Sequence, residues 1–168
     1  MSEEKEQDDG NYGQEAAGEQ AGRQFAIQKI YLKDTSFETP NSPAIFTEKW
    51  EPAINLELQT SGSPLADNVH EVVLTVTMTV KLGEKTAYLV EVHQAGVFTV
   101  NGIEGEELGH LLGSYCPNIL FPYVRAAISD IVIKGGFPQI LLTPVNFDAL
   151  YAQRKEQGSD PAAEQFVH

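Results

Sequence analysis

One segment constrains the fold more than any other: from Glu71 to Leu82, large apolar residues occupy every second position. A period of two is that of an extended strand with one buried face. Gly83 and Glu84 then favour a tight turn, and the segment from Thr86 to Val100 continues with the same period. The chain is therefore predicted to form a long antiparallel hairpin. Its apolar face would comprise Val72, Leu74, Val76, Met78, Val80, Leu82, Tyr88, Val90 and Val92.

Two further segments have strand character. Residues Ile54 to Thr60 alternate between apolar and polar, which predicts a half-buried strand. Residues 25–38 are less regular, because Lys29 and Lys33 interrupt the pattern, and this suits an edge strand or a bulge. The segment PNSPAIFTEKWEP between them contains three prolines, so we expect an irregular crossover that covers apolar surface. Four antiparallel strands result.

The second half of the chain is predicted to be helical. We expect a short helix over residues 104–112 and a longer one over residues 118–134, which Gly135 and Gly136 would end. Pro122 would fit only near the first turn of that helix or at a kink. A last helix would begin after Asn146 as its N-cap. The fold class is α+β: a four-stranded antiparallel sheet followed by helices packed on one face.

The segment from Gly109 to Tyr151 has more apolar surface than this fold can bury. A sheet covers only one stripe of a helix, whereas these residues are apolar nearly all round. A helix of this kind must also face another subunit or a ligand. The segment is therefore predicted to serve in assembly and binding.

The organisation of the chain is that of one folded domain, over residues 24–155, between two polar tails. Residues 1–23 are predicted to be a disordered acidic tail, and residues 156–168 a flexible C-terminal tail. The N-terminus lacks the plan of a signal peptide, and we expect no apolar run to reach the length of a transmembrane helix. Cys116 is the single cysteine, so no intramolecular disulfide can form. We expect a soluble cytoplasmic protein.

Acidic residues are in excess throughout. The formal net charge is -13, and residues 25–151 carry fourteen acidic against seven basic side chains. This balance disfavours nucleic acid and anionic membrane surfaces as partners and favours a basic protein. Asp34, Ser36 and Glu38 share one parity of their strand, and Glu57, Leu89 and Glu91 lie on the non-core faces of theirs. If these faces coincide, they form an acidic platform; the alternative is an ordinary solvated face.

The sequence contains no constellation typical of an enzyme or a metal site. Ser114 lacks the glycine two residues on that a nucleophile elbow requires. His110 and Cys116 have no further ligand at metal-binding spacing, and the glycines of GIEGEELG are wrongly spaced for a dinucleotide loop. We therefore expect no catalytic residues, no metal and no cofactor.

Several longer strings resemble SecB, the family of proteobacterial export chaperones: YLKDTSFETPNSPAIF, HEVVLTVTMTV, LGEKTAYLVEVHQAGVF, GSYCPNILFPYVR and FPQILLTPVNFDALY. The resemblance covers residues 24–152. It implies an ATP-independent holdase that keeps secretory precursors unfolded and delivers them to the motor ATPase SecA. It also implies a homotetramer, built as a dimer of dimers, in which the surplus apolar surface divides between assembly and unfolded clients.

The resemblance also implies roles for individual residues. SecA binding would fall on Asp34, Glu38, Leu89 and Glu91, and tetramer assembly would depend on Val90, Val92 and Gln94. Client binding would involve Phe46, Trp50, Tyr115, Phe121, Tyr123, Phe137, Leu141 and Leu142. Two alternatives stay open at this point: a carrier of a small apolar ligand, and a SecB-like chaperone dedicated to one partner such as an antitoxin.

Overall fold

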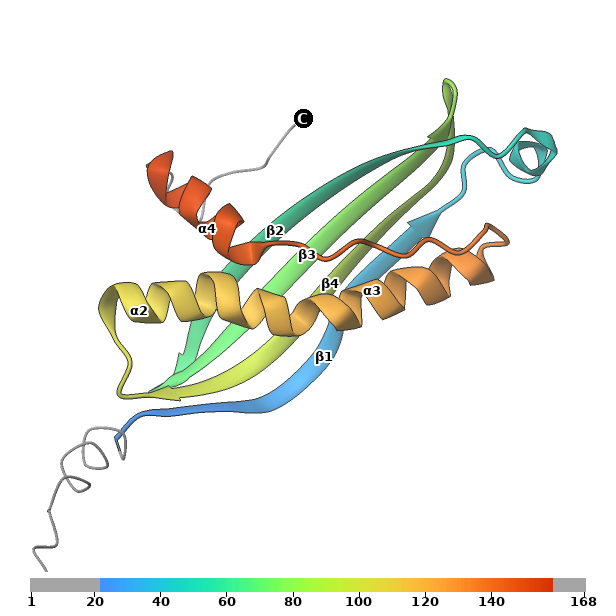
Figure 1. The fold of residues 1–168 in the computed structure, drawn as a ribbon. Coiled ribbons are helices and arrows are strands. Elements are labelled where there is room, and N and C mark those ends of the chain that lie inside the picture. The colour runs from blue at the N-terminus through green and yellow to red at the C-terminus, as the bar shows by residue number, and fades with distance from the viewer. Residues whose placement is uncertain (1–21, 159–168) are drawn as a thin grey trace, which may run out of the picture.

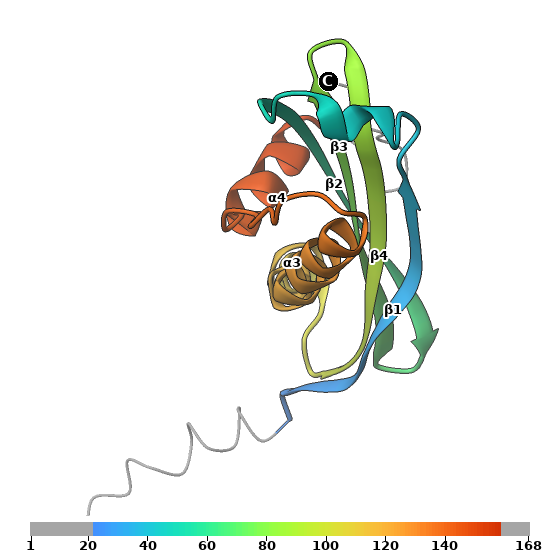
Figure 2. The same cartoon turned by 90° about the vertical axis from the view of Figure 1, so that its right-hand side faces the viewer.

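The computed structural model describes residues 22–158, so most of each predicted tail lies outside the described residues. A four-stranded sheet forms one layer and the helices form a second layer on one of its faces (Figures 1 and 2). We call the helix-covered side of the sheet the inner face and the other side the open face. The predicted α+β class, with strands first and helices after, is confirmed.

The sheet is antiparallel throughout, with the strand order β1-β4-β3-β2. The strands are β1 (Gln24–Glu38), β2 (Pro52–Ala66), β3 (Val69–Leu82) and β4 (Lys85–Asn101). The β3–β4 hairpin forms as predicted, and Gly83 takes a positive φ of 61° in its turn, a conformation that glycine adopts without steric cost.

Strand β2 is longer than the sequence predicted. Residues Ser61, Gly62, Ser63 and Pro64 look like a loop, yet they continue the pairing with β3. An edge strand needs only one hydrogen-bonded neighbour, so a proline can be accommodated there. The following turn is stabilised by Asn68, whose φ is 60°, a conformation that asparagine tolerates better than most residues.

Strand β1 lies at the opposite edge and carries two register shifts, one between Ile27 and Lys29 and one between Leu32 and Asp34. The sequence pattern suited an edge strand or a bulge, and the strand shows both features. Each extra residue reverses the alternation of side chains along the strand. The second shift brings Asp34 and Glu38 opposite His93 and Leu89 of β4, on the open face.

The main helix is continuous, and the expectation of two separate helices was wrong. Helix α2 (Gly105–His110) passes through the π-helical turn η2 (Leu111–Tyr115) directly into α3 (Cys116–Lys134). Pro122 lies inside α3. The helix persists because its buried stripe packs along the sheet, and this packing outweighs the lost backbone hydrogen bond. Residues 105–134 are also long and apolar enough to cross a membrane by length and composition, contrary to the sequence expectation.

The core lies between α3 and the inner face of β3 and β4. From the sheet it includes Val72, Leu74, Val76, Met78, Val80 and Phe98, and from α3 Leu120, Val124, Ile128 and Val132. Gly96 allows the close approach, since a Cβ there would lie 2.6 Å from the Phe98 ring and 3.2 Å from Leu120. Buried and half-buried residues alternate strictly along β3 from Val72 to Val80, and the buried set is the one that packs against α3.

The remaining elements are short. The predicted irregular crossover contains one 3₁₀ turn, η1 (Ala44–Thr47), which buries Ile45. Helix α4 (Phe147–Glu156) begins as predicted after Asn146, whose side-chain oxygen accepts a hydrogen bond from the Ala149 amide at 3.0 Å. It packs against the π-helical turn η2, in the helical layer and on the side of the molecule where β2 forms the sheet edge (Figures 1 and 2).

Candidate functional site

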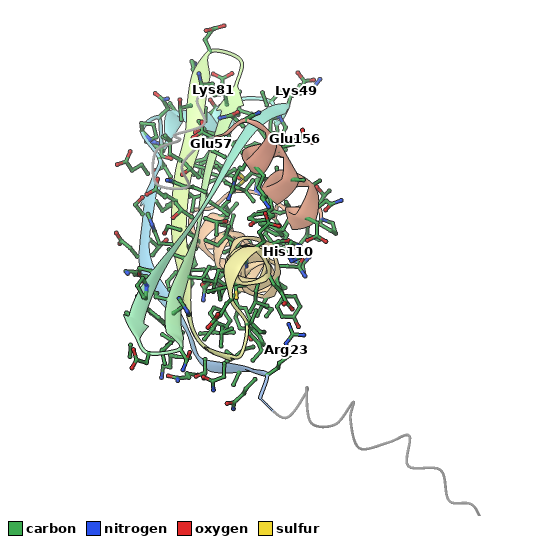
Figure 3. All side chains as sticks on the ribbon, turned by 90° about the vertical axis from the view of Figure 1, so that its left-hand side faces the viewer. Arg23, Lys49, Glu57, Lys81, His110 and Glu156 are labelled. Carbon is green, nitrogen blue, oxygen red and sulfur yellow. The ribbon has the colours of Figure 1, made fainter. Side chains whose placement is uncertain are left out.

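The four residues assigned to SecA binding do share one face of the sheet. Glu38 pairs with Leu89, and Ser36 pairs with Glu91, while Asp34 pairs with His93. Directly opposed residues of antiparallel strands point to the same side. Glu57 joins them, because it pairs with Thr77, which itself pairs with Glu91. Figure 3 shows Glu57 on the sheet layer and His110 on the helical layer.

The carboxylate of Glu91 is held by hydrogen bonds to both oxygens. His93 Nε2 lies 2.6 Å from Glu91 Oε1, and the hydroxyl of Thr77 donates to Oε2 at 3.0 Å. The hydrogen bond from His93, followed by that from Thr77, lowers the pKa of the Glu91 carboxyl below its ordinary value, although partial burial opposes this. Glu91 is therefore ionised at neutral pH, and its side chain is 41% exposed.

The opposite end of the open face is neutralised. Lys33 and Tyr31 of β1 reach across β4 and donate hydrogen bonds to Glu71 of β3. The hydrogen bond from Lys33 is the largest cause of a lowered pKa at Glu71. Negative charge is therefore concentrated on what we call the acidic end of the open face: Asp34, Glu38, Glu57 and Glu91. Within residues 22–158, none of these four forms an ion pair with lysine or arginine.

The residues assigned to assembly lie on the inner face. Val90, Val92 and Gln94 are almost completely buried, and α3 packs against their strand. Their side chains are thus inside the protomer, and any influence on assembly would pass through the position of α3.

Three of the residues assigned to client binding come together in an aromatic cluster beside the crossover. The ring of Phe137 lies 5.0 Å from Phe46, 6.0 Å from Trp50 and 4.8 Å from Tyr88. Phe46 is exposed, Trp50 is half-buried and Phe137 is buried. Sequence reasoning placed Tyr88 on the inner face but missed its place in this cluster, because the contact depends on where the crossover returns.

The other five residues are dispersed. Phe121 is buried against Phe147 at 5.8 Å, and Leu142 is also buried. Tyr115 packs on Phe25 at 5.3 Å yet stays largely exposed. Tyr123 and Leu141 are exposed. The eight residues therefore divide between core positions and exposed apolar positions, and the exposed ones all come from the helical side of the molecule or its connections.

A second polar cluster docks α4, and the sequence analysis missed it. Asp148 of α4 accepts hydrogen bonds from Ser114 and from His110 Nε2, the latter at 2.8 Å. These bonds, that from Ser114 first, lower the pKa of Asp148. Tyr151 lies over Gly113, where a Cβ would approach its ring to 2.7 Å. The i, i+4 spacing of His110 and Ser114 was the available sequence signal.

This cluster is not arranged for nucleophilic catalysis. In a serine triad the histidine lies between the nucleophile and the acid, whereas here Ser114 and His110 both bond to the same Asp148 oxygen. Across the part of the chain that the structure describes, no group of three metal-ligating side chains converges. The geometry of the cluster suits attachment of α4.

Comparisons with known proteins agree on one family. Residues 18–158 match the family described as preprotein translocase subunit SecB. The chain is 60% identical to the protein-export protein SecB of Nitrosococcus oceani over 153 residues, which is 90% of this chain and 92% of that one. It is also 60% identical to that of Methylococcus capsulatus over 144 residues, covering 86% and 93% of the two chains.

A solved structure has the same fold. A SecB-like chaperone of Mycobacterium tuberculosis, in complex with a peptide from an antitoxin, aligns with a TM-score of 0.60 at 16% identity. The alignment covers 79% of this chain and 97% of that one. At this identity the likeness concerns the fold.

Proposed function

The chain belongs to the SecB family and is a chaperone for protein export, and we propose that it acts in the cytoplasm as an ATP-independent holdase that delivers unfolded precursors to SecA. The observation that carries this proposal is the division of the sheet into two unlike faces. Exposed apolar side chains of the helices and their connections include Phe46, Tyr115, Tyr123 and Leu141, whereas carboxylates without a lysine or arginine partner within residues 22–158 gather on the open face. A holdase that also docks on a motor needs two surfaces of this kind.

The client surface is proposed on the helical side. The exposed residues Phe46, Tyr115, Tyr123 and Leu141 would contact unfolded chains directly. The half-buried Trp50 and the buried Phe121, Phe137 and Leu142 would form the walls behind them. Apolar and aromatic surface binds many sequences because burial of apolar area is non-directional.

The SecA surface is proposed on Asp34, Glu38, Leu89 and Glu91. The acidic end would attract a basic surface of the partner, and Leu89 supplies a half-buried apolar contact among the charges. Because this surface lies on the opposite side of the sheet from the client surface, both partners can bind at once.

Assembly is proposed as a homotetramer, a dimer of dimers. Ile133 is a large apolar residue on α3 that remains exposed in the single chain, and exposed surface of this kind marks an interface. Changes at Val90, Val92 or Gln94 would shift α3 and so disturb the interface indirectly.

The first test of holdase activity is the refolding of several unrelated, slow-folding secretory precursors without ATP. We expect refolding to be blocked stoichiometrically for every precursor. A block confined to one partner would instead favour the dedicated chaperone. Unchanged refolding at every ratio would refute the holdase proposal and favour the carrier of a small apolar ligand.

The test of the two surfaces is Glu91→Lys, studied in the full-length chain by calorimetry with SecA. We expect SecA binding to weaken by about a hundredfold, because a like charge then opposes the basic partner, while client binding is retained. Glu156→Lys makes the same charge change on α4 and serves as the control (Figure 3). Equal loss of SecA and client binding in Glu91→Lys would contradict separate surfaces.

A further inference from the structure

His93 lies two residues from Glu91 on β4, at the margin of the acidic end, and has no role in the functions assigned so far. It projects from β4 on the open face, opposite Asp34 of β1 and Thr75 of β3. Its side chain is 30% exposed, so it is reachable from solvent but supported by its neighbours.

The hydrogen bonds of His93 form a directed chain. Thr75 Oγ1 lies 3.0 Å from His93 Nδ1, and His93 Nε2 lies 2.6 Å from Glu91 Oε1. With the single proton on Nε2, the uncharged ring accepts from Thr75 and donates to Glu91, and every polar atom of the ring is satisfied. Thr77 bonds the second oxygen of Glu91. The carboxylate is thereby fixed in direction, and its remaining lone pairs are free for a partner.

The surrounding charges make the state of His93 matter. Asp34 faces it from β1, and Glu57 lies beyond Thr77 on β2. Lys33 precedes Asp34 in β1, but its ammonium group forms an ion pair with Glu71 and not with Asp34 or Glu91. Among residues 22–158, His93 is the titratable side chain that contacts Glu91. A proton gained by His93 would therefore offset the charge of Glu91 directly.

We propose that His93 is the positioning residue of the SecA surface: uncharged, it orients Glu91 toward a basic group of the partner, and protonated, it cancels the charge of Glu91. This inference rests on the proposed function. Its consequence is that SecA binding weakens when His93 gains a proton, which a comparison of about pH 8 with about pH 6 can detect.

The test is calorimetric titration of SecA with the full-length tetramer at about pH 8 and about pH 6, for wild type, His93→Gln and His93→Leu. Glutamine retains an amide donor for Glu91 but does not titrate, whereas leucine has no donor. At the higher pH we expect His93→Gln to bind as wild type does and His93→Leu to bind about tenfold more weakly. At the lower pH we expect wild type to bind about tenfold more weakly than His93→Gln.

The ratio of SecA affinities between wild type and His93→Gln is compared at the two pH values. Groups that titrate on SecA affect both proteins equally and therefore do not change this ratio. If the two lose affinity equally between the two pH values, the role of His93 is refuted. Binding of His93→Leu as tight as wild type at the higher pH would also refute it. Client holding, measured on the same preparations, reports whether each variant is folded; if His93→Leu is not, the ratio between wild type and His93→Gln still decides.

Glu91→Lys distinguishes failure of the proposed role of His93 from failure of the proposed SecA surface. If Glu91→Lys loses SecA binding but the pH dependence of His93→Gln equals that of wild type, only the inference about His93 fails. If Glu91→Lys binds SecA normally, the proposed SecA surface itself is wrong, and the role of His93 fails with it.

Discussion

Successive residues of the central strands β3 and β4 point alternately to the inner face and to the open face, yet the two faces are stabilised by different interactions. On the inner face, Val76 and Val92 oppose one another and are fully buried. One position along each strand, on the open face, Thr77 opposes Glu91, and a hydrogen bond joins them. The inner face is stabilised by apolar burial, which tolerates little change. The open face is stabilised by polar pairs that solvent can partly replace. Its side chains can therefore be chosen for binding a partner with little loss of stability.

The largest expected effect comes from the same charged substitution on either face. Val92→Asp would place a carboxylate without a partner in the core and should destabilise the protein by more than about 4 kcal/mol, or prevent folding. Leu89→Asp, on the open face, should cost less than about 1 kcal/mol. Urea denaturation of both variants measures the contrast, and similar losses in the two would abolish the distinction between the faces.

An intermediate effect is expected where α4 docks on the helical layer. Gly113→Ala would bring a Cβ to 2.7 Å from the Tyr151 ring, which should loosen α4 by about 1–3 kcal/mol. Hydrogen exchange of the α4 amides should therefore accelerate. Gly62→Ala is the matched control, because its Cβ would make an ordinary contact of 3.8 Å with the Glu71 carbonyl. Unchanged exchange in Gly113→Ala would show that Tyr151 does not fix α4.

A smaller effect with opposite signs is expected for two threonines. The hydroxyl of Thr60, on the inner side of β2, is buried without a partner, so Thr60→Val should leave stability unchanged or raise it by up to about 1 kcal/mol. The hydroxyl of Thr77 bonds Glu91 on the open face, so Thr77→Val should lower stability by about 1 kcal/mol. Urea denaturation at neutral pH tests both, and the same sign in the two variants would contradict the comparison.

The smallest effect concerns the titration of Glu91. Its pKa is lowered, mainly by the hydrogen bond from His93. The stabilisation from this bond is therefore present above the ordinary pKa of glutamate, about 4.3, and is lost as the pH falls through the lower folded value. Carboxyl-carbon NMR should report this lowered midpoint, and His93→Leu should raise it. An unchanged midpoint in His93→Leu would show that the bond is not formed in solution.

The sequence predicted those features that depend on local periodicity. The alternation in β3 identified its buried face, and the irregular lysines of β1 indicated an edge strand or a bulge. Parity put Asp34 and Glu38 on one face of their strand but left open whether Glu91 shares it; the register shows that it does. Their role in SecA binding stays a prediction.

The features that were missed depend on tertiary contacts. The residues from Ser61 to Pro64 form a strand because they pair with β3, and not because of their own strand propensity. The helices join through η2 because α3 packs on the sheet. The bond between His93 and Glu91 spans two residues of one strand, yet His93 is also bonded by Thr75 of its neighbour, a pairing that only the register reveals.

The arrangement of β4 has an evolutionary consequence. Because successive residues of this strand belong to different surfaces, loss or gain of a single residue within it would exchange the two surfaces along its whole remaining length. Selection should therefore conserve the length of β4 more strictly than the identity of many of its residues. The exception lies at Ala87, where the pairing shifts from Val80–Tyr88 to Lys81–Thr86. An inserted residue there would alter only the hairpin tip, so variation in length among descendants of this chain should collect at that end.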